Sequence, residues 1–371
     1  MNIAFYDPFQ LDYVVSTPYR QPLGGAESSL CHLAAELARL GHAVTVLNST
    51  STPGVHLGVT CLNRDHETSL ADLRRFDRII VLNVPVASHL RPKLGPEARL
   101  ILWSGDAHDM PRPQLLGDPA EQRSWDAIVF KSEWQRRKFI ERFGLRSERT
   151  KVLHNAVGPP FQDLFAERGD VLAAKYDPPI LAYTSTPFRG LEVLLKIFPA
   201  VRRRMLGVRL RVYSSMQVYQ YANDRAAFGG LYQRCSEMEG VEYIGSLPQP
   251  ELARALRCVS VLAYPCTYAE MYCTSVMEAM AAGCRIVTSD LGAMPETTGG
   301  YATLVPHIKP GENPERFARD FSAALTGVLE ETVRDAPIAE KRLGEAIARV
   351  NQFATWPVRA REWSQWLEAM G

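Results

Sequence analysis

The feature that most constrains the fold of this chain is a regular alternation of short apolar segments with longer segments of helical periodicity. In the first half, the short apolar segments lie at residues 2–6, 43–47, 78–82, 100–103 and 127–130. Residues 26–40 and 133–143 instead repeat their apolar positions with the spacing of an amphipathic helix. Strands that alternate with helices in this way predict a doubly wound, largely parallel sheet with helices on both faces.

A second alternating series follows Pro159 and Pro160. Its expected strands cover residues 180–183, 209–213, 259–263 and 285–288, and its expected helices cover 191–204, 249–256 and part of 310–329. A chain of 371 residues is long enough for two such domains. We therefore expect an α/β protein with one Rossmann-like domain over residues 1–165, a second over 175–350, and a linker within 159–178.

The last residues, 351–371, are expected to form a separate helical element. Trp356 is followed by Pro357, and proline is favoured at the first position of a helix. Trp363 and Leu367 then lie on one apolar stripe, which predicts that this helix is buried along one side.

Two carboxylates, Glu270 and Glu278, are separated by seven residues in a segment that is typical of a loop running into a helix. Thr274 or Ser275 is expected to cap that helix, and Gly283 to end it. One acid then lies on the loop and the other one turn inside the helix. The unpaired N–H groups and positive partial charge of a helix N-terminus are suited to phosphate. A phosphate with a carboxylate on either side describes a nucleotide-sugar site, because carboxylates accept bonds from hydroxyl groups.

This spacing resembles the Glu-x7-Glu motif of the family 4 retaining glycosyltransferases. Other landmarks of that family follow in its order: a glycine loop at 24–27, a mid-chain pattern at 129–134 and 151–157, the turn of its phosphate-binding base at 187–192, and the segment beside its base pocket at 245–252. The resemblance implies the GT-B fold, in which two facing Rossmann-like domains bind acceptor and nucleotide sugar, and a C-terminal helix crosses back to the N-terminal domain.

The resemblance also assigns roles around the two acids. Glu278 is expected to accept bonds from the ribose hydroxyls of the donor, and Glu270 from hydroxyls of the donor sugar. The backbone N–H groups of Tyr272, Cys273 and Thr274 are expected to reach the sugar or the diphosphate. The family usually has a Phe-Gly pair at this point, so the sugar pocket of this chain is expected to have its own shape.

Arg189 precedes Gly190 at a strand-to-helix turn and matches the position of the family's phosphate-binding lysine. We expect its guanidinium to clasp the two phosphates and to stabilise the leaving diphosphate. Hydroxyl residues stand where the family has a second base, and Ser185 is expected to contact the donor there. Ser275 in the first helical turn and Leu247 beside the base pocket complete the expected donor site.

Residues of the first half are also candidates. Gly24 and Gly25 would let the backbone approach the donor phosphate or the acceptor, although a simple turn before a helix also explains them. Asp106 and His108 follow the expected strand 100–103 at its carboxyl end, where ligands bind in open α/β sheets. We expect these two side chains near the reacting sugar, with a polar loop of no catalytic duty as the alternative.

Bulk properties restrict the partners and the compartment. With 42 basic and 41 acidic residues, the chain lacks the excess charge of a nucleic-acid-binding protein. Basic clusters at 136–138 and 202–204 are interpreted as solvated helix faces, with a membrane-surface patch as the alternative, since many members of the family act on lipid-linked acceptors. Seven cysteines without a Cys-x2-Cys pair, together with an N-terminus that lacks a signal-peptide layout, predict a cytoplasmic protein. Within the cytoplasm, the inner face of the membrane is a further expected location of the protein.

The sequence therefore predicts a retaining glycosyltransferase that moves a sugar from a nucleotide diphosphate to a glycan, lipid-linked or protein acceptor. A UDP-sugar is favoured and a GDP-sugar comes next. The resemblance implies that no metal or other cofactor is needed, and the absence of a clustered Asp-x-Asp dyad fits this expectation. Two alternatives are an epimerase or phosphorylase of the same fold and a non-catalytic relative that binds a nucleotide sugar.

Overall fold

A computed structural model describes residues 1–65, 73–165, 170–221, 224–307 and 313–370. The chain forms two compact units, one of Met1–Ala156 with Trp356–Gly371 and one of Val157–Thr355. The boundary between the two units thus follows Ala156, earlier than the predicted residue 165. The C-terminal segment of the first unit begins at Trp356 and not at the predicted residue 351. Each unit is built on its own parallel sheet.

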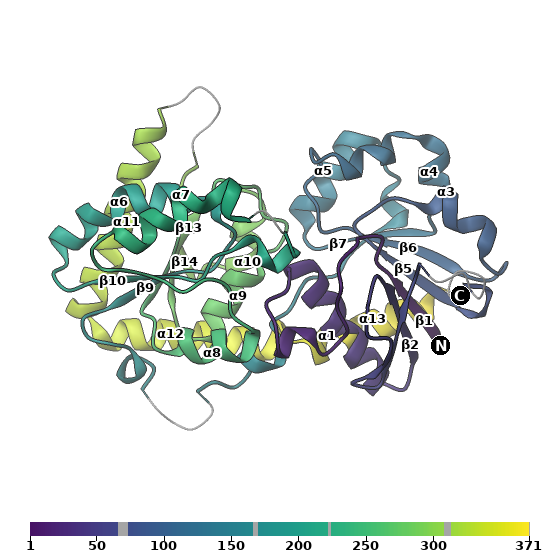
Figure 1. Cartoon of the computed structure of the whole chain (residues 1–371), viewed down its shortest axis with the longest axis horizontal. Coiled ribbons are helices and arrows are strands. Elements are labelled where there is room, and N and C mark those ends of the chain that lie inside the picture. Colours follow the sequence, from purple (N-terminus) through teal and green to yellow (C-terminus); the bar gives the residue numbers. More distant parts are fainter. Residues whose placement is uncertain (66–72, 166–169, 222–223, 308–312, 371) are drawn as a thin grey trace. The chain divides into compact units, whose positions relative to one another are not determined.

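The first unit contains an eight-stranded sheet with helices on both faces (Figure 1). Its strands, in spatial order, are β3 (Gly54–His56), β4 (Val59–Asn63), β2 (Ala43–Asn48), β1 (Asn2–Tyr6), β5 (Arg78–Leu82), β6 (Arg99–Trp103), β7 (Ala127–Phe130) and β8 (Thr150–Val152). Neighbouring strands are parallel except β3 and β4. The helices are α3 (Ala87–Leu90), α4 (Pro119–Ser124) and α5 (Glu133–Phe143) on one face, and α1 (Gly25–Arg39) and α13 (Trp356–Ala369) on the other.

Strand β1 shows why side chains on both faces of the central strands are apolar. Ile3 and Phe5 enter the core layer that also contains residues of α1 and α13. Ala4 and Tyr6 enter the opposite layer, with residues of α3 and α5. A parallel sheet covered on both faces needs apolar residues at every position of its central strands.

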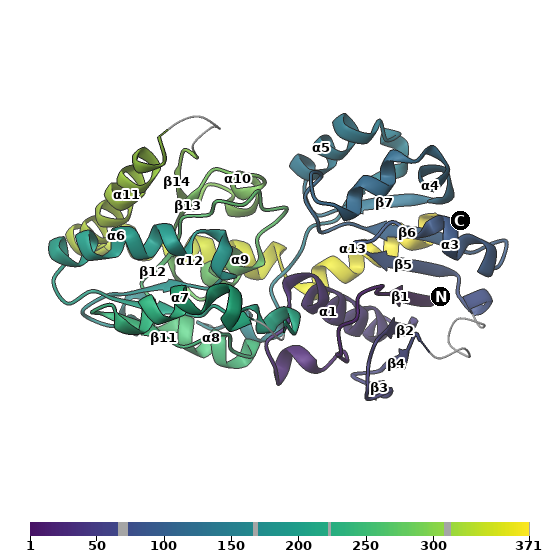
Figure 2. The ribbon, with the colours of Figure 1, turned by 45° about the horizontal axis from the view of Figure 1, so that its top comes forward.

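Helix α13 supplies large side chains to the first of these layers. Trp356, Trp363 and Leu367 are buried there, and the Trp363 ring lies 5.3 Å from the Trp103 ring on β6. The helix packs against α1 (Figure 2). The apolar stripe predicted for this helix is therefore its buried side.

The second unit contains a six-stranded, fully parallel sheet. Its strands, in spatial order, are β11 (Val241–Tyr243), β10 (Arg209–Val212), β9 (Ile180–Tyr183), β12 (Val261–Tyr264), β13 (Arg285–Ser289) and β14 (Ala302–Val305). Its helices are α6 (Leu191–Arg204), α7 (Asp224–Glu237), α8 (Gln249–Arg257), α9 (Thr274–Ala281), α10 (Met294–Thr298), α11 (Pro314–Arg334) and α12 (Ala336–Phe353). Helix α6 packs beside α11, and α9 packs beside α12 (Figure 2).

The strand order of this sheet reverses between β9 and β12. From β9 the chain proceeds outward through β10 and β11, and then returns to the other side of β9 to form β12, β13 and β14. Loops that leave the carboxyl ends of two such strands run in opposite directions, which leaves a crevice for ligands. We call this point, between the ends of β9 and β12, the switch point.

The predicted doubly wound architecture is confirmed, together with the strands at 2–6, 78–82, 127–130 and 180–183 and the helices at 133–143 and 191–204. Strands β3, β4, β8, β11 and β14 and helices α3, α4, α7, α10 and α12 were not predicted. The first residues of the helix expected within 310–329 lie outside the described residues, and α11 continues to Arg334. Within the described ranges, no helix combines the length and apolar character needed to cross a bilayer.

Candidate functional site

Except for Leu247, which follows β11, the predicted donor residues of the second unit lie on the two loops at the switch point and in α9. The loop after β9 carries Ser185 and Arg189, and the loop after β12 carries Glu270 and leads into α9. Ser275, in the first turn of α9, donates through Oγ to the carbonyl oxygen of Thr184 at 2.9 Å and links the two loops. Because parallel strands end at the same edge of a sheet, residues far apart in the sequence meet here.

Helix α9 begins at Thr274 without a side-chain cap. Cys273 is its N-cap residue and forms no capping bond, so the prediction that Thr274 or Ser275 caps the helix is wrong. The Ser275 hydroxyl is instead used by Thr184, and the Cys273 amide already donates to Thr297 Oγ1 at 3.2 Å. The uncapped end still places a positive partial charge at the switch point.

Glu270 is buried and is fixed at both its carboxylate and its backbone. Oε1 accepts bonds from Arg189 Nη1 and from the Tyr264 hydroxyl, each at 2.7 Å. The Ala293 amide donates to the Glu270 carbonyl oxygen at 2.7 Å. A Cβ on Gly292, whose φ is +69°, would lie 2.5 Å from that oxygen, so only glycine allows this close approach.

Arg189 is held by aromatic rings and by a tight turn. Its guanidinium carbon lies 4.6 Å from the ring centre of Tyr268 and 5.5 Å from that of Phe188. Gly190 has a φ of +118°, and a Cβ there would lie 2.0 Å from the Pro265 carbonyl oxygen. Among the described residues, the buried Nε of Arg189 has no hydrogen-bond partner. An anionic ligand would satisfy that donor.

Glu278 is buried in the second turn of α9, where Gln249 Nε2 donates to its Oε1 at 3.3 Å. Burial raises the pKa of Glu278 to about 8, and the bond from Gln249 lowers it in part. The carboxyl group is therefore largely protonated at neutral pH. Sequence reasoning missed Gln249, although it lies within the segment 245–252 that was matched to the family's base pocket.

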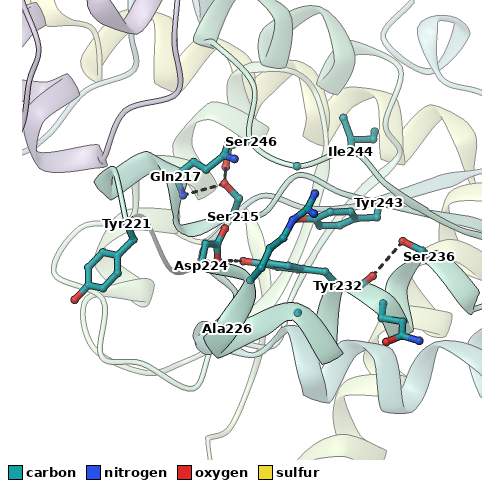
Figure 3. A pocket seen from close by; sticks show the side chains of 14 residues that line it. Ser215, Gln217, Tyr221, Asp224, Ala226, Tyr232, Ser236, Tyr243, Ile244 and Ser246 are labelled. Carbon is teal, nitrogen blue, oxygen red and sulfur yellow. Dashed lines mark hydrogen bonds between the residues drawn. The ribbon is translucent and has the colours of Figure 1, made fainter.

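A cavity of about 730 Å³ lies between α7 and the loops that follow β10 and β11 (Figure 3). The rings of Tyr232 and Tyr243 stack with their centres 4.9 Å apart, and Tyr232 donates to Asp224 Oδ1 at 2.6 Å. Across the cavity, Ser246 Oγ donates to Ser215 Oγ at 3.1 Å. This cavity has aromatic and hydroxyl walls, which suit a flat heterocycle with polar edges.

The cavity only partly matches the sequence expectation. Its wall includes Ile244, Gly245 and Ser246, whereas Leu247 packs against the hydrophobic core of the unit. The predicted segment is thus adjacent to a cavity, but Leu247 does not line it. Sequence reasoning missed the contribution of α7, which no motif marked.

The glycine pair of the first unit has no special backbone conformation. Gly24 is the N-cap residue of α1 with φ of −57°, and Gly25 is the first residue of that helix. Neither has a positive φ, so only the missing Cβ would let the backbone approach a ligand here. What remains is a loop without side chains at the start of α1.

Asp106 and His108 lie on the loop after β6, as predicted. Both carboxylate oxygens of Asp106 accept bonds from Arg112, at 2.6 and 2.7 Å. His108 meets the Trp134 ring edge to face with ring centres 6.2 Å apart. These contacts favour the alternative of a polar loop held by its own residues, and they belong to a different unit from Arg189 and Glu270.

The basic clusters are largely neutralised by acidic neighbours. Arg204 pairs with Glu330 at 2.7 Å, and Arg202 pairs with Glu239. In α5, Lys138 pairs with Glu141 at 2.9 Å. The interpretation of solvated helix faces fits these contacts. In the part of the chain that the structure describes, no three His, Cys, Asp or Glu side chains converge as metal ligands.

Residues 178–326, which contain Arg189, Glu270 and Glu278, match the family model described as "Glycosyl transferases group 1". This part of the chain is similar to the group 1 glycosyltransferases. Phosphatidyl-myo-inositol mannosyltransferase of Mycobacterium tuberculosis is 28% identical over 176 residues, which are 47% of this chain and 42% of that protein. D-inositol 3-phosphate glycosyltransferase of Nocardia farcinica is 25% identical over 231 residues, which are 58% of this chain and 48% of that protein. The matches span less than half the length of these relatives. The family match and these relatives confirm the predicted resemblance to family 4.

Solved structures extend the likeness to the whole chain. Sucrose-phosphate synthase from Thermosynechococcus elongatus superposes with a TM-score of 0.69 at 16% identity, covering 100% of this chain and 99% of that one. HepE of Anabaena in complex with UDP-glucose gives a TM-score of 0.66 at 17% identity, with 100% of both chains covered. The predicted GT-B fold is therefore confirmed.

Proposed function

We propose that this protein transfers a sugar from a nucleoside diphosphate donor to an acceptor hydroxyl group. The observation that carries the proposal is the meeting of Glu270, Arg189 and the uncapped start of α9 at the switch point. This edge combines a carboxylate, a cation and amide donors, which are the groups that a sugar diphosphate requires. The structure of HepE, which has the same fold and contains UDP-glucose, supports a nucleotide sugar as the donor.

In this proposal each group contacts one part of the donor. The diphosphate lies at the start of α9 and accepts a bond from the buried Nε of Arg189. Glu270 accepts a bond from a sugar hydroxyl, and Glu278 interacts with the ribose. The cavity beside α7 takes the nucleobase, for which uracil comes first and guanine next.

The proposed transfer retains the anomeric configuration and uses no enzyme nucleophile and no metal. The bond between the anomeric carbon and the β-phosphate oxygen breaks, and the diphosphate leaves with both electrons. Arg189 and the amides of α9 stabilise the charge that builds on it. An oxygen of the leaving phosphate takes the proton of the acceptor hydroxyl, whose oxygen bonds to the same face of the sugar. Cys273 is a poor nucleophile, because burial raises its pKa well above the usual range.

The proposed acceptor is a hydroxyl of a glycan, a lipid-linked glycan or a protein. The names of two relatives include an inositol compound, which supports a polyol hydroxyl as the group that receives the sugar. We place the protein in the cytoplasm, with contact to the inner face of the membrane where the acceptor is lipid-linked.

Thermal unfolding of the full chain with UDP, GDP, ADP and their common sugar conjugates tests the proposal. We expect one nucleotide sugar to raise Tm by about 3 °C at concentrations near 100 times its Kd. Proton NMR of that donor with a panel of acceptors then gives the product, and an α-linked product from an α-linked donor shows retention. Turnover that persists with a chelator supports metal independence.

Other outcomes identify the alternatives. Interconversion of the donor without an acceptor identifies an epimerase, and sugar phosphate formed from a glycan and inorganic phosphate identifies a phosphorylase. Saturable binding with no turnover across the panel identifies a non-catalytic relative, in which Arg189 serves only to hold Glu270. A Tm that no nucleotide changes contradicts the proposal.

A further inference from the structure

The carboxylate of Glu270 is held asymmetrically. Oε1 accepts both described bonds, from Arg189 Nη1 and from the Tyr264 hydroxyl, each at 2.7 Å. Within the described ranges, Oε2 has no hydrogen-bond partner. One oxygen is therefore immobilised by two donors, and the other is left to accept a bond from a ligand hydroxyl.

The hydroxyl of Tyr264 has a defined direction. A phenol has one proton, and it is given to Glu270, because a carboxylate paired with Arg189 can only accept. Ser185 Oγ lies 3.2 Å from the Tyr264 oxygen and must therefore be the donor of that bond. Burial raises the pKa of Tyr264 well above its usual range, so the hydroxyl keeps its proton. The bonds run from Ser185 to Tyr264 and from Tyr264 to Glu270.

Tyr264 is positioned by the sheet, whereas Glu270 lies on a loop. Tyr264 is the last residue of β12 and is 1% exposed. Its ring meets the Tyr183 ring of β9 edge to face, with ring centres 5.7 Å apart and planes at 74°. A side chain on a rigid strand fixes geometry more accurately than one on a loop.

We propose that Tyr264 is a positioning residue of the donor site, which holds Glu270 Oε1 so that Oε2 meets a hydroxyl of the donor sugar. The inference rests on the proposed function, since it takes the sugar as the ligand of Glu270. It carries a selective consequence. A nucleotide without its sugar does not contact Glu270, so Tyr264 contributes to binding of the nucleotide sugar and not of the nucleotide.

Calorimetric titration of wild type and Tyr264→Phe tests this directly. The ligands are UDP and UDP-glucose, or GDP and GDP-mannose if the thermal screen selects guanosine. We expect Tyr264→Phe to leave the Kd of the nucleotide within about twofold and to weaken the nucleotide sugar about five- to tenfold, as one hydrogen bond to a charged group is lost. Because Tyr264 acts through Glu270, its substitution in a Glu270→Gln background should cause little further loss.

Two further variants make the test specific. Tyr183→Phe is the matched control, because it removes a buried phenol that bonds to the Thr186 carbonyl at 2.7 Å and not to Glu270. It should leave the ratio of the two Kd values unchanged. Ser185→Ala removes the bond behind Tyr264 and should weaken the nucleotide sugar in the same direction by a smaller factor. It also serves if Tyr264→Phe fails to fold by circular dichroism.

The outcomes separate this inference from the proposed function. Equal loss of affinity for both ligands in Tyr264→Phe, or independent effects of Tyr264→Phe and Glu270→Gln, overturns the positioning role alone. The positioning role is also overturned if wild type binds the nucleotide sugar no more tightly than the nucleotide alone. A wild-type protein that binds no nucleotide overturns the proposed function, and the inference with it.

Discussion

At the scale of single residues, Glu278 keeps a carboxyl group buried in α9. Burial raises its pKa to about 8 from the ordinary value of 4.5, against a bond from Gln249 that lowers it. Between these two values the folded protein holds a proton that the unfolded chain has released. The contribution of Glu278 to the free energy of unfolding is therefore largest below pH 4.5 and is lost as the pH rises towards about 8.

Glu278→Gln removes this titration and keeps the shape of the side chain. We expect the variant to match wild type near pH 5 and to be more stable near pH 9 by roughly 2–5 kcal/mol, since charging the buried acid is then avoided. Urea unfolding at both pH values measures the difference. Glu251→Gln, at an exposed position of the neighbouring α8, controls for the loss of one surface charge. A difference that does not change with pH would contradict the expectation.

Local motifs predicted residues that the structure brings together, but not the contacts between them. Arg189 and Glu270 were each recognised from their local segments, yet their ion pair joins residues 81 positions apart. That pairing depends on which strands are neighbours, and a local pattern does not contain strand order. Tyr264 was missed for the same reason. In the sequence it is only the last residue of an apolar strand, and its bond to Glu270 is visible only in the structure.

At the scale of elements, helix boundaries were predictable where local residues set them. Ser132 caps α5 by accepting from the Gln135 amide, and Gly144 ends it with a φ of +64°. Helix α7 gave no comparable signal, because few of its residues are buried and the apolar stripe is weak. Strands such as β11 are three residues long and half-buried, so neither length nor alternation marks them.

Lys175 connects the ends of two helices in the second unit. Its Nζ donates to the carbonyl oxygens of Arg257, at the end of α8, and of Ala282, at the end of α9, at 2.9 and 2.8 Å. A cation at the C-terminus of a helix is favourable for the helix dipole and satisfies carbonyl groups that have no partner in the helix. Lys175 therefore anchors the C-terminal end of α9, opposite to the end at the proposed donor site.

Lys175→Met keeps the aliphatic stem and removes the donor. We expect the free energy of unfolding to fall by about 2–3 kcal/mol, because two carbonyl groups lose their partner. Chemical denaturation measures the loss. Lys196→Met, which removes an exposed ion pair with Glu315, is the matched control and should cost less than about 1 kcal/mol. Similar losses in the two variants would show that Lys175 acts only as a surface charge.

At the scale of the whole molecule, the first unit draws its core from both ends of the chain. Trp363 of α13 is fully buried against Trp103 of β6, whereas Trp366 is only partly buried at the margin of the same layer. Trp363→Ala should lower the free energy of unfolding by about 3–5 kcal/mol through loss of burial and a residual cavity. Trp366→Ala should cost clearly less. Guanidinium unfolding followed by circular dichroism compares the two, and equal losses would contradict the role given to α13.

The discontinuity of the first unit has a consequence for biosynthesis. A nascent polypeptide leaves the ribosome from its N-terminus, and most domains fold as soon as they emerge. Here the leading β-sheet is made early, but the tryptophans that seal it belong to Trp356–Ala369 and are translated only after all of Val157–Thr355. The second unit can thus fold co-translationally while the first waits with an unsealed apolar layer, a state that chaperones are suited to protect.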